Sequence, residues 1–166
     1  MTTRNQETAV AGKQKTVSIR RTFNLPVNVM WKAWTEPESF KKWWGPTDYS
    51  CHDCTIDLKV GGKYLASMQG PDGKKIWSTG TIKEIVPMKK IVYTDNFADS
   101  QGNIVPASYY NMPGEWPGNV EVTVTLAEEN GKTKLTMDQT NIPEEMYDDC
   151  IKGWQQSFDK MESNLK

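Results

Sequence analysis

Four adjacent residues have side chains that can bind a metal ion: Cys51, His52, Asp53 and Cys54. A Cys-x-x-Cys pair can provide two zinc ligands, and the imidazole or the carboxylate could provide a third. The four positions are contiguous, however, and outside them the chain has only one more cysteine, Cys150, and no other histidine. In a strand, Cys51 and Asp53 would face away from His52 and Cys54. We therefore interpret the segment as ordinary strand residues and expect no metal site.

The inventory of catalytic groups is small. His52 is the single histidine, so any Ser–His or Asp–His pair would have to use it. Asp95 is the other candidate acid or base, because Tyr93, Asp95 and Phe97 share one face of an expected strand. On an inner face the pKa of this carboxyl group would rise. We favour the alternative, a strand-end carboxylate facing water or the following loop, and so predict no catalytic residue and no cofactor.

The C-terminal stretch is the element against which the rest of the chain must pack. From Pro143 to Leu165, bulky apolar residues recur every three or four positions, which predicts an amphipathic α-helix. Pro143 suits a first helical turn, and the acidic residues that follow it suit the positive end of the helix dipole. About 23 residues at about 1.5 Å each give a rod of roughly 34 Å, long enough to cross a small domain.

Most of the preceding residues alternate between apolar and polar side chains, which predicts antiparallel strands joined by tight turns. Asn130-Gly131 is the clearest hairpin signal. Two short helices, at 27–35 and 37–43, follow the first strand, and 98–118 is a long loop rich in glycine and proline. The predicted class is α+β, a curved antiparallel sheet of about six to seven strands around one helix. The predicted strands cover residues 17–25, 55–58, 63–69, 75–86, 90–97, 120–126 and 133–140.

Length and composition restrict the class of protein. A chain of 166 residues predicts a single domain, 16–166, after a polar leader, 1–15, that we expect to be disordered. The net charge is -1 and there is no basic block, so we expect no nucleic-acid partner. No apolar run could span a membrane, the N-terminus lacks a signal-peptide pattern, and the three cysteines suggest no disulfide framework. We therefore expect a cytoplasmic protein, a monomer or a homodimer.

Several segments together resemble a known protein family. The segments are Trp34-Thr-Glu-Pro-Glu, Lys42-Trp43-Trp44-Gly45-Pro46, Asp57-Leu-Lys-Val-Gly-Gly-Lys-Tyr64, Gly80-Thr-Ile-Lys-Glu-Ile-Val-Pro87, Ile91-Val-Tyr-Thr94 and Gly153-Trp154-Gln-Gln-Ser157. In this order they resemble the branch of the START-like (SRPBCC, helix-grip) superfamily that is homologous to the activator of Hsp90 ATPase. The resemblance covers roughly residues 16–165 and implies the helix-grip fold, with a cavity between sheet and helix that often admits an apolar ligand.

The resemblance implies a cavity, and large side chains are the candidates to line it. They come from the short helices, the strands, the long loop and the last helix. A glycine inside a helix costs about 1 kcal/mol relative to alanine, so Gly153 suggests close packing or room for a guest. For each ring taken singly, packing in an ordinary core is the competing interpretation. The candidate ligand-binding residues are Trp34, Trp43, Trp44, Met68, Tyr93, Asp95, Phe97, Tyr109, Tyr110, Met112, Trp116, Gly153, Trp154 and Phe158.

The function expected from these residues and the resemblance is binding of a small apolar or aromatic molecule, and a non-enzymatic role is favoured. Two alternatives remain open. The first is a co-chaperone-like protein that has an Hsp90-type chaperone as its partner and stimulates its ATPase. The second is a polyketide cyclase-like enzyme, since related START-like branches include such enzymes.

Overall fold

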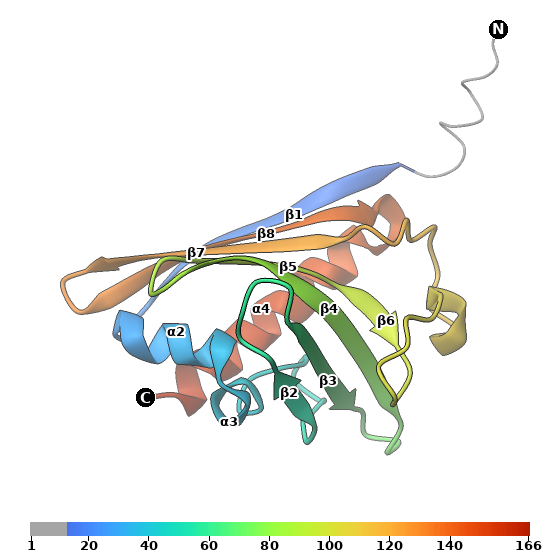
Figure 1. Cartoon of the computed structure of the whole chain (residues 1–166), viewed down its shortest axis with the longest axis horizontal. Coiled ribbons are helices and arrows are strands. Elements are labelled where there is room, and N and C mark those ends of the chain that lie inside the picture. The colour runs from blue at the N-terminus through green and yellow to red at the C-terminus, as the bar shows by residue number, and fades with distance from the viewer. Residues whose placement is uncertain (1–12) are drawn as a thin grey trace, which may run out of the picture.

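A computed structural model describes residues 13–166. These residues form an eight-stranded antiparallel sheet that curves around one long helix, α4 (Tyr147–Asn164) (Figure 1). The predicted α+β class and helix-grip fold are confirmed. The other elements are β1 (Gln14–Phe23), α2 (Val27–Thr35), α3 (Pro37–Phe40), β2 (Cys54–Ile56), β3 (Lys63–Gln69), β4 (Lys75–Val86), β5 (Lys90–Thr94), β6 (Asn96–Ala98), the 3-10 turn η1 (Ala107–Tyr110), β7 (Glu121–Glu129), β8 (Lys132–Pro143) and the 3-10 turn η2 (Glu144–Met146).

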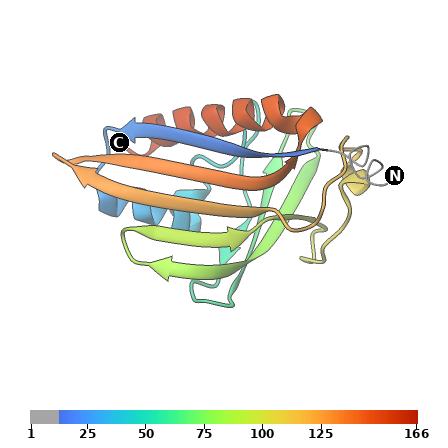
Figure 2. The ribbon, with the colours of Figure 1, turned by 90° about the horizontal axis from the view of Figure 1, so that it is seen from above.

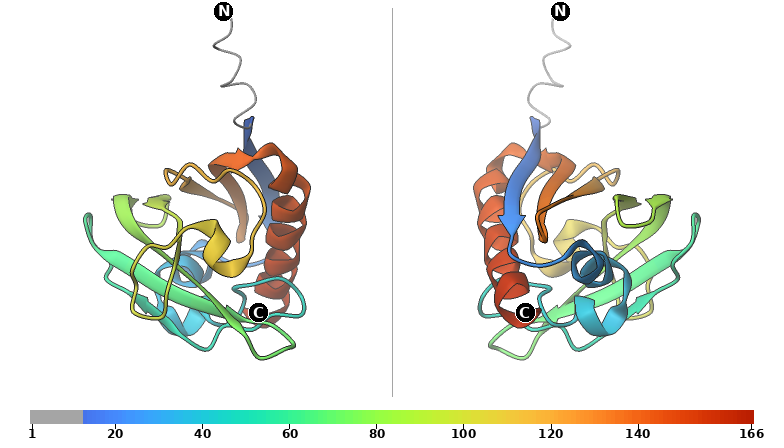
Figure 3. Two further views of the ribbon diagram at one scale, coloured as in Figure 1. Left: turned by 90° about the vertical axis from the view of Figure 1, so that its right-hand side faces the viewer. Right: turned by 90° about the vertical axis from the view of Figure 1, so that its left-hand side faces the viewer.

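The sheet runs in the order β1-β8-β7-β5-β4-β3-β2, and β6 pairs with β4. Seen from above, β1, β8, β7 and β5 lie side by side and α4 runs along the β1 edge (Figure 2). The end-on views show the sheet curving from β1 around to β2, with α4 on its concave side (Figure 3). The short helices α2 and α3 lie at the end of the molecule where the C-terminus lies (Figure 1).

The core lies where the inner faces of the strands meet the apolar stripe of α4. Alternation puts Val122, Val124 and Leu126 of β7 on the inner face, and all three are buried. Phe158 and Met161 of α4 are fully buried against this layer. The core therefore follows from two periodicities, two residues in the strands and 3.6 in the helix.

An aromatic cluster joins α2, α3 and α4. The Trp34 and Trp43 ring centroids are 4.8 Å apart, and the Trp34 and Trp154 centroids are 6.0 Å apart. Phe40 stacks on Trp44 at 4.9 Å. The indole N–H of Trp43 donates to the Ala33 carbonyl at 2.9 Å, so this fully buried ring is also fixed in orientation. The cluster closes one end of the space between the sheet and α4.

The predicted start of the last helix was wrong. Pro143 is the last residue of β8 and pairs with Gln14, and α4 begins only at Tyr147, after η2. Proline has no N–H, so it suits the end of a strand as well as a first helical turn. The pairing of β8 with β1 extends from Thr133 to Pro143, and this long ladder decides between the two positions.

Other boundaries differ less. The ranges predicted for β3 and β4 coincide with the observed ones, whereas the predicted strand 90–97 is divided into β5 and β6 at Asp95. α3 ends at Phe40 rather than at residue 43. β1 begins at Gln14, inside the predicted leader, and the leader's other residues, 1–12, lie outside the described part. In residues 13–166 no helix has the length and apolar character needed to cross a membrane.

Candidate functional site

A pocket of about 540 Å³ lies between the sheet and α4. Its lining comes from four parts of the chain: the segment 44–46, residues of the sheet, the segment 104–120, and α4 with the turn before it. The sheet contributes residues of β3, β4, β6 and β8, together with Asp95 between β5 and β6. Most of the lining side chains are apolar. The polar ones are Ser78, Asp95, Asn96, Gln139, Asp149 and Ser157.

Eight of the fourteen candidate residues contribute to this lining. Gly153 faces the segment 44–46, where an added Cβ would lie 3.6 Å from Cγ of Pro46, an ordinary van der Waals distance. The glycine therefore borders the pocket without being in forced contact. Ligand binding by these residues stays a prediction. The eight are Trp44, Met68, Asp95, Phe97, Met112, Trp116, Gly153 and Trp154.

The other six candidates lie outside the lining. Trp34, Trp43 and Phe158 belong to the buried aromatic cluster, and Tyr93 is buried with its ring 5.3 Å from that of Tyr64. These four pack against other side chains, as the competing core interpretation held.

The two tyrosines of η1 do not reach the pocket either. Tyr109 is exposed. Tyr110 is partly buried, donates its hydroxyl hydrogen to the Ala98 carbonyl, and accepts the Trp77 N–H at 3.1 Å. It therefore anchors the loop to β4 and β6.

Asp95 is the polar centre of the site. The hydroxyl of Tyr64 donates to Oδ1 at 2.8 Å, and Nε2 of Gln139 donates to Oδ2 at 3.2 Å. Nε1 of Trp154 in turn donates to Oε1 of Gln139 at 2.8 Å. Burial raises the pKa of Asp95 to about 6, although both hydrogen bonds to the carboxylate act in the opposite direction. The favoured interpretation was a strand-end carboxylate facing water or the following loop. Asp95 does follow the last residue of β5, but it lies on the inner face and lines the pocket together with residues of that loop.

Gly80 explains how Asp95 takes this position. A Cβ built on Gly80 would lie 1.6 Å from the carbonyl oxygen of Thr94, so no other residue allows β4 to approach this closely. On its other side the N–H of Asp95 donates to the Val120 carbonyl at 3.0 Å. The backbone is thus held between two strands at the point where β5 gives way to β6.

Sequence reasoning missed Tyr64, Gly80 and Gln139. The sequence pattern around Gln139 could have identified it as a residue of the site. Leu135, Met137 and Gln139 are every second residue of β8 and therefore lie on the same face of the strand, so Gln139 places a polar amide on an otherwise apolar face. A polar residue at an inner position needs a buried partner, and that requirement indicates a polar site.

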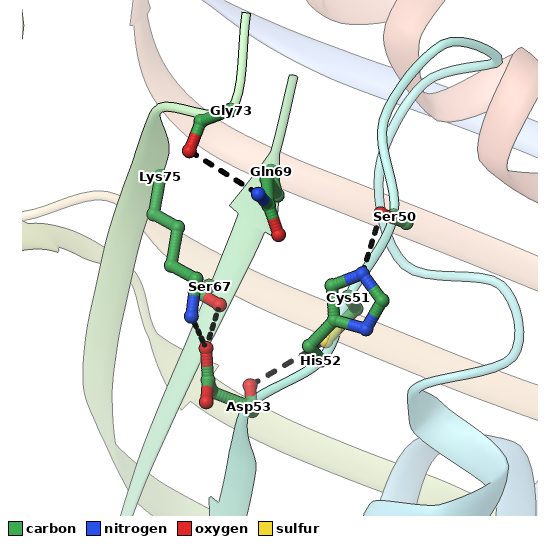
Figure 4. Close-up of polar contacts among 8 residues, drawn as sticks. All are labelled: Ser50, Cys51, His52, Asp53, Ser67, Gln69, Gly73 and Lys75. Carbon is green, nitrogen blue, oxygen red and sulfur yellow. Dashed lines mark hydrogen bonds and ion pairs between the residues drawn. The ribbon is translucent and has the colours of Figure 1, made fainter. Parts of the chain in front are cut away.

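The segment with the possible metal ligands serves a structural purpose (Figure 4). Asp53 accepts hydrogen bonds from Oγ of Ser67 and Nζ of Lys75, both at 2.7 Å, and Oγ of Ser50 lies 3.0 Å from Nε2 of His52. Burial raises the pKa of the Cys51 thiol to about 11, so at neutral pH it stays protonated. Within residues 13–166, no three His, Cys, Asp or Glu side chains are grouped so that they could hold a metal ion. The contacts of Asp53 tie the segment to β3 and β4.

The segment that carries Gly45 and Pro46 is held against α4 by polar contacts. Nζ of Lys160 donates to the carbonyls of Pro46, at 3.2 Å, and Tyr49, at 2.8 Å. The N–H of Thr47 donates to Oε1 of Gln156 at 3.0 Å. This part of the pocket wall is therefore fixed to the adjacent wall, which α4 forms.

Comparisons with known proteins agree with the geometry. Residues 24–166 match the family described as "Activator of Hsp90 ATPase homolog 1-like protein". Among curated proteins there was no match. The fold is similar to a solved structure from Chromobacterium violaceum, with a TM-score of 0.74 and 28% identity over 90% of this chain and 96% of that one. It is also similar to a solved structure from Arthrobacter aurescens, with a TM-score of 0.75 and 26% identity over 90% of this chain and 85% of that one. A third, an AHSA1 protein from Silicibacter pomeroyi, has a TM-score of 0.71 at 18% identity and covers 91% of this chain and 97% of that one, which is similarity of fold alone. The chain belongs to the activator of Hsp90 ATPase homolog 1-like family, a branch of the START-like superfamily.

Proposed function

We propose that the protein binds a small, largely apolar molecule in the pocket between the sheet and α4. The observation that carries the proposal is the pocket's volume, about 540 Å³. Small-molecule sites are typically about 300–1,000 Å³, mostly apolar, with a few convergent polar groups. This pocket has the same composition, with Asp95 and Gln139 as its central polar groups.

The rigidity of the walls also supports binding. Trp154 is fixed by its hydrogen bond to Gln139, and Lys160 fixes the segment 46–49, whose first residue, Pro46, lines the pocket. A site whose side chains are ordered before the ligand arrives loses less conformational entropy on binding. An apolar guest would also remove the exposed faces of the lining rings from water.

The test uses N-phenyl-1-naphthylamine, a neutral dye whose fluorescence rises in apolar surroundings. We expect saturable binding of one dye per chain by the wild type. Gly153→Leu should place a side chain at the pocket and weaken the dye affinity by about tenfold or more, whereas Gly153→Ala should leave it nearly unchanged, because the added methyl meets only an ordinary contact. Both variants improve helix propensity, so the pair separates a filled pocket from a damaged fold. Equal dye affinity in the two variants would contradict the proposal.

The natural ligand is best sought in the freshly purified protein by native mass spectrometry followed by denaturation. A discrete small molecule, released in proportion to the protein and absent from Gly153→Leu, would give the ligand's mass and chemical class.

A second candidate function is supported by the family description. The match to activators of Hsp90 ATPase covers residues 24–166. If this chain acts in the same way, adding it to an Hsp90-type chaperone raises the rate of ATP hydrolysis, and the two proteins co-purify. An unchanged hydrolysis rate together with no complex in a pull-down excludes this candidate.

A third candidate, a cyclase-like enzyme, is supported by Asp95. A carboxyl group in a pocket with a pKa of about 6 can accept or donate a proton at neutral pH. Any turnover found for this protein should then disappear in Asp95→Asn. Turnover that survives this substitution excludes Asp95 as the acid or base.

A further inference from the structure

We propose that the pocket selects a cation, an organic amine whose ammonium group meets Asp95 while its apolar body fills the remaining space. The inference rests on the proposed ligand-binding function and names the chemical class of the ligand. Four observations carry it: the charges of the lining, the lack of a counter-ion for Asp95 among the described residues, the direction of the hydrogen bonds and the aromatic rings of the lining.

The lining carries negative charge only. Asp95 and Asp149 are its ionisable carboxyl groups, and among residues 13–166 no lysine, arginine or histidine contributes to it. The remaining polar side chains of the lining are neutral amides and hydroxyls. A cleft with low-dielectric walls and charge of one sign concentrates ligands of the opposite sign. An anionic ligand would meet repulsion without any compensating contact.

Asp95 lacks a counter-ion in the described part of the chain. None of the salt bridges formed by residues 13–166 includes it. The titratable groups that interact with it are Tyr64 on β3, Tyr93 on β5 and Cys150 on α4, and Asp149, an exposed residue of α4, contributes to the same lining. Burial raises the pKa of both tyrosines well above the usual value and that of Cys150 to about 12, so all three are neutral at neutral pH. A bound ammonium group would supply the charge that the protein does not.

The hydrogen bonds around Asp95 fix it as an acceptor. Because Oε1 of Gln139 receives the Trp154 N–H, the amide is oriented with Nε2 toward Asp95. The Tyr64 hydroxyl donates from the other side. An ionised carboxylate has about four lone-pair positions, and these two donors use two of them. A ligand group that donates, as an ammonium does with three N–H bonds, fits the open positions, and a group that only accepts does not.

Aromatic rings complete the environment. Trp44, Phe97, Trp116 and Trp154 all contribute to the lining. The faces of such rings attract cations, by about 0.5–2 kcal/mol for each well-placed ring. The same rings provide apolar area for the ligand body. The pocket therefore favours both halves of an apolar amine.

The experiment compares three ligands with one ring system: 1-naphthylmethylamine, 1-naphthylmethanol and 1-naphthoate. Affinities are measured by calorimetry on the full chain at pH 7.5. We expect the amine to bind about tenfold or more tighter than the alcohol, and the carboxylate to bind most weakly. Asp95→Asn should bring the amine down to the affinity of the alcohol. Asp148 is an exposed carboxylate of α4 outside the lining, so Asp148→Asn is the matched control. This variant should still bind the amine more tightly than the alcohol.

The pH profile provides a second measurement on the wild type, which matters if Asp95→Asn does not fold. The amine affinity should rise between pH 5 and pH 7 as Asp95 loses its proton, and the alcohol affinity should change much less, because the alkylamine stays protonated throughout. Equal amine and alcohol affinities, parallel pH profiles, or a preference that survives in Asp95→Asn would overturn the inference while leaving the proposed function standing. No binding of the naphthyl ligands or the dye would overturn both.

Discussion

The buried side chain of Asp95 destabilises the folded state, although it provides the polar group of the proposed binding pocket. Transferring an ionised carboxylate into apolar surroundings is unfavourable, and the donors Tyr64 and Gln139 offset only part of that cost, since the pKa remains above its usual range. A residue that served packing alone would be apolar at this position. The contacts that keep Asp95 in place are therefore best understood as support for a polar group within the pocket.

This cost predicts a pH-dependent stability. The folded pKa of Asp95, about 6, lies above the ordinary value of 3.8, so the folded chain binds the proton more tightly than the unfolded chain. The contribution of Asp95 is fully present below pH 4 and is lost as the pH rises through 6. Relative to the wild type, Asp95→Asn should therefore gain up to about 3 kcal/mol in free energy of unfolding between pH 4 and pH 8. Urea titrations of both proteins at several pH values measure this difference. A constant difference would show that Asp95 does not titrate between these limits.

Two glycines should respond oppositely to the same substitution. Gly80→Ala puts a Cβ against the Thr94 backbone, which has no freedom to yield, and should destabilise by more than about 2 kcal/mol. Gly153→Ala meets an ordinary contact inside α4 and should stabilise by up to about 1 kcal/mol. Thermal or urea unfolding of the two variants checks both signs. A mild effect at Gly80 would mean that β5 and β6 can move away from β4.

At the scale of elements, the strands were predictable where one face is apolar and the turn residues are specific. The turn Gly70-Pro-Asp-Gly73 separates β3 from β4, Pro87 follows the end of β4, and both predicted ranges match the observed ones. The division between β5 and β6 was not predictable, because it depends on the close approach of Gly80 from another strand. The prediction that the last helix starts at Pro143 was wrong for a similar reason. Its local chemistry suits two positions, and only the ladder with β1 selects one.

The contact between α4 and the segment 46–49 leads to a prediction about one wall of the pocket. Lys160→Met keeps most of the aliphatic stem but removes the donor to the carbonyls of Pro46 and Tyr49. The Pro46 carbonyl keeps the N–H of Tyr49, at 2.9 Å, whereas the Tyr49 carbonyl loses the ammonium group. We expect a loss of about 1–2 kcal/mol and faster amide hydrogen exchange at Thr47 and Tyr49. Lys152 is an exposed residue of the same helix, and Lys152→Met is the control that should change neither the stability nor the exchange rates. Unchanged exchange in Lys160→Met would show that Gln156 alone holds the segment.

At the scale of the whole molecule, the sequence indicated which parts of the chain supply the site better than which side chains line it. The segment with the Trp43-Trp44 pair, the long loop and the last helix all contribute to the pocket, as the resemblance implied. At the tryptophan pair, however, only one of the two neighbouring rings faces the pocket: Trp44 contributes to the lining, whereas Trp43 is fully buried in the core. Periodicity cannot make that distinction outside regular elements, because the direction of a side chain in a turn depends on tertiary contacts.

The hydrogen bonds that connect Trp154 to Asp95 through Gln139 give the protein an intrinsic spectroscopic reporter. A change of charge on the carboxylate polarises the amide, and the amide in turn polarises the indole N–H. The other tryptophans with assigned environments lack such a connection: the indole nitrogens of Trp34 and Trp44 have no partner, and Trp43 and Trp116 donate to backbone carbonyls. The emission of Trp154 should therefore respond to the protonation of Asp95, so the unlabelled molecule can report the charge state of its own pocket.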